Sequence, residues 1–223
     1  MTATQQEAPR SAAPAGRRSR SRRRERRGSG FLGVLVGLAL AGGAVGIQSL
    51  ALDSDDMALP LTYTGDRGEE VDAGRFSARV DNVETAKGIQ QSDGVVATDQ
   101  IFLVVTLSAT VPDEPIKLTK DPAPAILLTA EGKRFAATKR VDSTLTLANR
   151  WIQPGWWAQG RVVFEVPPAV LPGSKVIVSA PNSAIYSEPL TPEAELDLGL
   201  DEEKAKQLTA APKDVYPLAE KRR

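Results

Sequence analysis

A block of arginines directly followed by a long uncharged stretch is the feature that most constrains this chain. Eight of the eleven residues Arg17–Arg27 are arginine, and the twenty-two residues Phe31–Leu52 carry no charge. A helix rising about 1.5 Å per residue would make that stretch roughly 33 Å long, enough to cross the hydrocarbon core of a bilayer. Because Lys and Arg beside a span stay on the cytoplasmic side, the N-terminus is predicted inside the cell and everything after Leu52 outside.

Other interpretations of the same region concern cleavage and nucleic acid. Small residues at Ser49–Leu50–Ala51 would allow cleavage as a signal peptide, although the apolar core of a signal is usually about 7–15 residues long. A twin-arginine signal is matched only weakly, because three residues separate Arg26–Arg27 from Phe31. Arginines beside a span are better explained by orientation and anionic lipid contact than by nucleic-acid binding. The predicted location is therefore the plasma membrane, crossed once.

Small residues recur in the predicted span at intervals of four. Such spacing lets two membrane helices approach closely, so a weak homodimer through the span is one expectation. The residues are Gly33, Gly37 and Ala41 in one series and Gly42 and Gly46 in another.

Charge and composition narrow the chemistry of the exported part. Residues 1–30 hold nine Arg and two Glu, a balance of +7, and the chain sums to zero, so the remainder carries −7. An acidic exported part disfavours a nucleic-acid partner. The chain has neither Cys nor His, which excludes disulfides, zinc sites and the common Ser-His-Asp and Cys-His centres. The linker acids Asp53, Asp55 and Asp56 could bind calcium, but an isolated acidic run is more often solvated, so no metal or cofactor is expected.

From about Leu61 the apolar pattern becomes that of strands. Alternate residues of Ile101–Val111 are apolar along one face, which predicts a strand. A turn containing Gly132 between two apolar runs predicts a hairpin of Ala125–Thr129 with Arg134–Thr138. Further strands are predicted at Arg75–Val83, Trp156–Val166, Lys175–Ala180 and Ile185–Leu190.

Six or seven short strands with Pro and Gly turns predict an all-β fold, an antiparallel β-sandwich. After it, Asp201 is predicted to cap a helix through Leu208, and residues 209–223 are expected to be loose. The predicted organisation is a disordered Arg-rich tail at 1–30, a transmembrane helix at 31–52, a linker at 53–60, the sandwich at 61–190 and an acidic, partly helical extension at 191–223.

Segments of the predicted sandwich resemble those of exported immunoglobulin-like domains of Gram-positive bacteria, including actinobacterial secreted antigens and lipoproteins. The matching segments are Phe102–Leu107, Leu127–Phe135, Gln153–Gly155 and Gly160–Pro167. The resemblance covers about residues 65–180 and implies an immunoglobulin-like fold outside the cell, with no catalytic residues to carry over. The chain departs from the pattern at Val111–Pro115, where an Asn-containing turn is usual, and it lacks the lipidated Cys of many relatives.

The three tryptophans lie close together around Pro154–Gly155. Alternation along a regular strand would turn Trp156 into the core and leave Trp157 facing outward. An exposed Trp is a natural anchor for a partner, and an Arg beside it could make a cation–π contact, bind an anionic ligand or form a surface salt bridge. The candidate partner-binding residues are Trp157, Arg150 and Trp151. The simpler alternative is that Trp157 lies flat on a neighbouring loop.

Carboxylates in predicted loops are the remaining route to catalysis. A glycoside hydrolase needs two of them at a fixed separation, and nothing in the sequence places any two so. The carboxylates in predicted loops are Asp93, Asp99, Asp113, Glu114 and Asp121. The leading hypothesis is therefore a non-catalytic, membrane-anchored binding or scaffold protein, accessory to cell-envelope machinery and bound to an envelope protein. The alternative is a module that binds envelope glycan or lipid through its tryptophans.

Overall fold

The structure is a computed structural model that describes residues 59–118, 125–181 and 190–219. The predicted tail, the predicted span with both small-residue series, and linker residues 53–58 lie outside these ranges, as does all of the predicted strand Ile185–Leu190 except its last residue. Within the described ranges no helix is both long and apolar enough to cross a membrane.

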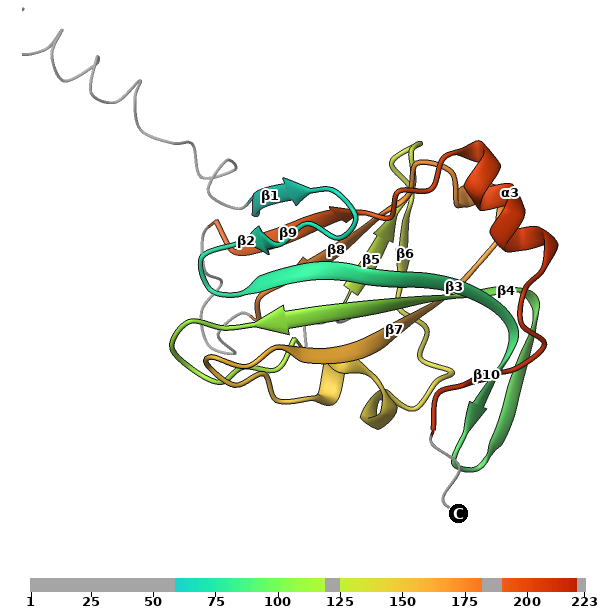
Figure 1. Ribbon diagram of the computed structural model, residues 1–223, viewed down its shortest axis with the longest axis horizontal. Coiled ribbons are helices and arrows are strands. Elements are labelled where there is room, and N and C mark those ends of the chain that lie inside the picture. The colour runs from blue at the N-terminus through green and yellow to red at the C-terminus, as the bar shows by residue number, and fades with distance from the viewer. Residues whose placement is uncertain (1–58, 119–124, 182–189, 220–223) are drawn as a thin grey trace, which may run out of the picture. The chain divides into compact units, whose positions relative to one another are not determined.

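Two β-sheets pack against each other, which confirms the predicted sandwich (Figure 1). Sheet A contains, in spatial order, β1 (Leu61–Gly65), β9 (Pro192–Asp197), β8 (Lys175–Ser179), β5 (Ala125–Leu128) and β6 (Arg134–Ala136). Sheet B contains β10 (Tyr216–Pro217), β3 (Ser77–Gln91), β4 (Gly94–Thr110) and β7 (Ala158–Val166), with β2 (Val71–Asp72) also paired to β3. The helical elements described are the 3-10 turns η1 (Ser143–Leu145), η2 (Leu147–Asn149) and η3 (Pro168–Val170), and the α-helix α3 (Glu202–Ala210).

The main core lies between the sheets and follows from strand alternation. Leu103, Val105 and Leu107 of β4 are buried in it, as the one-sided pattern predicts. β4 pairs with β3 on one side and β7 on the other, so it is an inner strand of sheet B. Burial of these side chains from both sheets is the main source of stability for a chain without disulfides.

Local turn and cap chemistry places the hairpin and the helix where the sequence predicts them. β5 pairs antiparallel with β6, and Gly132 takes a φ of 80° in the turn between them, a conformation that favours glycine. The Asp201 side chain accepts a hydrogen bond of 2.7 Å from the backbone N–H of Lys204. It thereby caps α3, which runs two residues beyond the predicted end at Leu208.

The outer face of sheet B carries a second, smaller apolar cluster. Phe102, Val104 and Val163 point away from the main core yet are buried. Two segments cover them: one through Val141, and the C-terminal segment through Tyr216 and Leu218. This half of the outer face is therefore a core in its own right.

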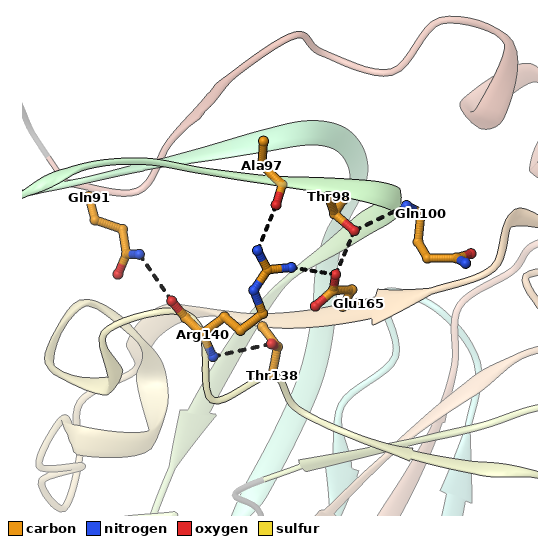
Figure 2. A network of polar contacts seen from close by, with 7 residues as sticks. All are labelled: Gln91, Ala97, Thr98, Gln100, Thr138, Arg140 and Glu165. Carbon is orange, nitrogen blue, oxygen red and sulfur yellow. Dashed lines mark hydrogen bonds and ion pairs between the residues drawn. The ribbon is translucent and has the colours of Figure 1, made fainter.

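A polar network holds the first of these covers in place (Figure 2). Arg140 donates to Glu165 Oε1 on β7 at 2.6 Å and to the Ala97 carbonyl oxygen on β4 at 2.8 Å. Thr98 Oγ1 donates to the same Glu165 oxygen at 2.5 Å, and Gln91 donates to the Arg140 carbonyl oxygen at 3.1 Å. The Arg140 guanidinium lies 6.0 Å from the centre of the Phe102 ring, so these bonds close the apolar cluster from outside.

The expectation that residues 209–223 are loose is wrong for the part that the structure describes. β10 pairs in parallel with the end of β3, and Lys213 joins Glu84 through an ion pair of 2.5 Å. Leu218 is buried in the small cluster. The reason is tertiary, because Tyr216 and Leu218 have no apolar partner on their own segment and find one only on the outer face of sheet B.

The sheets continue past residue 190, where the sequence places the end of the sandwich. β9 lies between β1 and β8, and its pairing with β1 is parallel, as is that of β10 with β3. The prediction of an antiparallel sandwich is therefore wrong for these two pairs, in which strands distant in sequence meet without a hairpin between them. Glu193 is buried in β9 and accepts a hydrogen bond of 2.8 Å from Thr62 Oγ1. The acidic residues of β9 resemble those of a solvated extension in sequence. Only its pairing with β1 and β8 makes β9 an inner strand of sheet A.

Candidate functional site

The tryptophans lie on a loop, residues 150–157, between η2 and β7. Ile152 is fully buried at its middle and exchanges two backbone hydrogen bonds with Ile116, of 2.8 and 3.1 Å. Pro154 forms a parallel bridge with Val111, just after β4 ends. Gly155 then takes a φ of 74°, which turns the chain toward β7. The loop is therefore anchored by backbone pairing at Ile152 and Pro154, between Trp151 and the other two exposed rings.

The prediction that Trp156 lies in the core is wrong. Its side chain is 77% exposed, more than any other large apolar residue described. β7 begins only at Ala158, so the alternation that buries Val162 and Phe164 does not extend back through the turn at Gly155. Trp156 instead projects from a turn in which its N–H donates to the Gln153 carbonyl oxygen at 3.3 Å.

Trp157 and Trp151 are exposed by 39% and 57%, and each has a cation over its ring. The Arg79 guanidinium lies 4.8 Å from the centre of the Trp157 ring. The Lys117 ammonium lies 5.2 Å from the centre of the Trp151 ring and donates to Asn149 Oδ1 at 2.9 Å. Cations at these distances are attracted to the negative ring face. The site is thus an aromatic surface with positive charge at its edges.

Arg150, the cation expected beside the rings, has another partner. It donates to the Gln159 carbonyl oxygen on β7. Sequence reasoning missed Arg79 and Lys117, which lie far from the tryptophans along the chain. Arg79 and Gln159 both pair with Ser108, so the sheet register puts Arg79 in one row with Gln159, two residues from Trp157. The available signal was that alternation in the predicted strand Arg75–Val83 turns Arg79 outward. Alternation does not give the pairing register, so it could not place Arg79 near Trp157.

The partly buried carboxylate of Asp81 holds Arg79 in place. Asp81 Oδ1 pairs with Arg79 Nε at 2.9 Å, and Asp81 Oδ2 accepts from Ser108 Oγ at 2.5 Å and from Gln159 Nε2 at 2.9 Å. Partial burial raises the pKa of Asp81, but the hydrogen bonds from Ser108, Gln159 and Arg79 outweigh it, and the pKa lies below its ordinary value. The ionised Asp81 therefore fixes the cation on which Trp157 stacks.

The exposed rings border an open surface hollow of about 530 Å³. Its lining is mostly apolar and rigid, which suits a flat or convex partner better than a small molecule that needs enclosure. The residues that line it are Trp151, Gln153, Pro154, Trp156, Trp157 and Ala158.

The carboxylates considered for hydrolysis are not brought together. Asp93 and Asp99 lie at the start of β4, whereas Asp113 and Glu114 follow its end, and all four are exposed. The β4 residues between Asp99 and Thr110 alone span about 36 Å. In the described ranges no three acidic, His or Cys residues gather as a metal site, and Asp121 lies outside those ranges.

No protein-family model and no curated protein matches this sequence. Solved structures resemble the sandwich. A secreted protein of Mycobacterium tuberculosis, MPT63, is 16% identical with a TM-score of 0.42, over 63% of this chain and 98% of that one. The yjhA protein of Bacillus subtilis is 12% identical with a TM-score of 0.44, over 59% of this chain and 99% of that one.

A third similar structure is the putative lipoprotein ycdA of Bacillus subtilis. It is 17% identical with a TM-score of 0.43, over 63% of this chain and 40% of that one. The descriptions of these proteins agree with the resemblance indicated by the sequence, namely to secreted and lipoprotein domains of Gram-positive and mycobacterial origin. At such identities the likeness is one of fold.

Proposed function

We propose that this chain is a membrane-anchored, extracytoplasmic binding protein without catalytic activity, an accessory or scaffold of cell-envelope machinery. Residues 31–52 anchor it with the N-terminus in the cytoplasm, and an immunoglobulin-like sandwich displays the tryptophan loop outside. Its partner in that role is another component of the envelope, with a protein as the leading candidate.

The exposure of all three tryptophans on one anchored loop is the observation that supports this function. Large aromatic side chains are normally buried or used to bind, because leaving them in water forfeits the gain from burial. Here the loop backbone is fixed by Ile152 and Pro154, so little conformational entropy is lost when a partner covers the rings. Such rigid aromatic anchors are typical of binding hot spots.

Crosslinking of the full-length protein in native membranes, read by mass spectrometry, tests the proposal. The wild type is compared with Trp157→Ala, with Trp156→Ala and with Val95→Ala, a control at an exposed valine near the far end of β4. One protein captured by the wild type and the control but lost in both tryptophan variants is the expected result. A capture pattern that is the same in all four samples would contradict the assignment of this surface.

Envelope glycan or lipid is the second candidate, and the open apolar hollow favours it. Flat aromatic surfaces stack on sugar faces and on lipid headgroups alike. Because the chain has three tryptophans and all belong to this surface, its whole tryptophan fluorescence reports on the site. Purified glycan and lipid fractions of the envelope should each be titrated separately. Unchanged emission with every fraction would exclude this candidate.

A further inference from the structure

One end of the sandwich gathers three features that are far apart in sequence. β1 begins, β4 ends and β7 begins at the left end in Figure 1. The tryptophan loop immediately precedes β7, and the loop that carries Lys117 follows β4. Leu59, the first residue that the structure describes, lies two residues before the start of β1. We call this region the membrane-proximal end.

Exposed apolar side chains concentrate at the membrane-proximal end. Of the eight large apolar residues that are exposed in the described ranges, only Val95 and Val215 lie elsewhere. Leu61 donates its N–H to the carbonyl oxygen of Thr191, which places Leu190 beside the start of β1. The six residues are Leu59, Leu61, Leu190, Trp151, Trp156 and Trp157. They form two groups toward the same end, three leucines beside the start of β1 and three tryptophans on the loop before β7. Exposed apolar residues gathered toward one end, rather than scattered over the surface, indicate an interface.

The length of chain before the sandwich restricts what can cover this surface. Six residues, 53–58, separate the end of the predicted span at Leu52 from Leu59. Fully extended, they would reach at most about 22 Å. With the anchoring proposed above, a linker of this length would keep this end within that reach of the bilayer and would raise the local concentration of lipid at its surface.

We infer that the membrane-proximal end docks on the phospholipid surface of the membrane that anchors the chain, with Trp156 in the headgroup layer. The inference rests on the proposed membrane anchoring. Tryptophan favours this layer because its ring is apolar and its N–H is polar. The Lys117 ammonium, which has one side-chain acceptor in Asn149, faces the phosphates.

Aromatic burial rather than net charge drives this docking. The charge of Arg79 is offset by Asp81, and that of Lys117 by the exposed Asp113 and Glu114 of its own loop. Long-range attraction to anionic lipid is therefore small, and added salt screens little of the interaction. Docking should occur on phosphatidylcholine as well as on mixtures with phosphatidylglycerol.

The test uses the full chain reconstituted in phospholipid vesicles, made with or without bromine on the acyl chains as a tryptophan quencher. Trp151→Phe with Trp157→Phe leaves Trp156 as the only fluorophore. The matched control replaces all three tryptophans by Phe and adds Val95→Trp, a reporter at the opposite end of β4. Flotation of the vesicles first establishes that both chains are anchored.

Quenching of Trp156 by brominated lipid, with its emission shifted to shorter wavelength and with Val95→Trp unaffected, is the expected result. It should persist at raised salt. Absence of quenching at Trp156, or equal quenching at both positions, would overturn the docking. A protein captured through the tryptophans in native membranes together with unquenched Trp156 would leave the proposed function standing and refute lipid as the occupant. Failure of the chain to float would remove the anchoring on which both depend.

Discussion

The two halves of the outer face of sheet B have the same strand alternation, but one half is covered by other segments and the other is not. Around Phe102, Val104 and Val163, outward side chains are buried by Val141 and the C-terminal segment. Around Gln159 the face is polar and exposed and ends in the exposed Trp157, and Ser108 is buried there only beneath polar neighbours such as Asp81. The difference is the presence of a covering segment, held on the first half by the Arg140–Glu165 pair. An outward position in a strand is therefore not the same as an exposed one.

The largest effect is expected in the covered half. Phe102→Ala removes a fully buried ring from the small cluster, and we expect it to lower the free energy of unfolding by about 3–5 kcal/mol. Urea unfolding followed by circular dichroism measures it. A loss below about 1 kcal/mol would mean that the small cluster is not a true core, and that the two halves of the outer face do not differ in the way described.

The C-terminal cover should show a smaller loss. Leu218→Ala, at a buried position, is expected to cost about 2–3 kcal/mol. Val215→Ala is the matched control, because Val215 is exposed on the same segment and should change stability by less than about 0.5 kcal/mol. If the two variants unfold at the same urea concentration, the segment does not cover sheet B in solution.

On the open half, the carboxylate that holds Arg79 should contribute in a pH-dependent way. Because the folded pKa of Asp81 lies below its unfolded value near 3.8, its contribution is present above that pH and is lost as the pH falls through the folded pKa. Asp81→Asn should cost about 1 kcal/mol at neutral pH. The gap from wild type should close below pH 3.8. Urea unfolding at neutral pH and at several acidic values checks this, and a constant gap would contradict it.

The smallest effect on stability belongs to the tryptophan that the sequence places in the core. Trp156→Ala should change the free energy of unfolding by less than about 0.5 kcal/mol, because its ring is 77% exposed. The same substitution should abolish partner capture in native membranes. A loss of several kcal/mol in urea unfolding, as at Phe102, would show that the ring is covered within the protein itself.

Local patterns predicted most of the strands. They also predicted the hairpin turn and the start of the C-terminal helix, which depend on turn and capping chemistry. Gly132 marks the hairpin and Asp201 marks the start of α3 because each acts through bonds to residues nearby in sequence. At the site, Trp157 is exposed, as alternation along the predicted strand Trp156–Val166 indicated, although the observed strand begins only at Ala158. The position of Trp156 could not follow from it, because the pattern does not show where a strand begins after a turn.

By itself, then, the sequence determined the charge asymmetry, the predicted span, the sandwich class and the clustering of all tryptophans around Pro154–Gly155. Only the tertiary structure decided that β9 is a central strand, that the C-terminal segment covers sheet B, and that Arg79 and Lys117 lie over the rings. Alternation assigns a residue to a face of its own strand, whereas pairing, register and coverage depend on segments far away along the chain. For the same physical reason, the two cations over the tryptophan rings became visible only once those segments were in place.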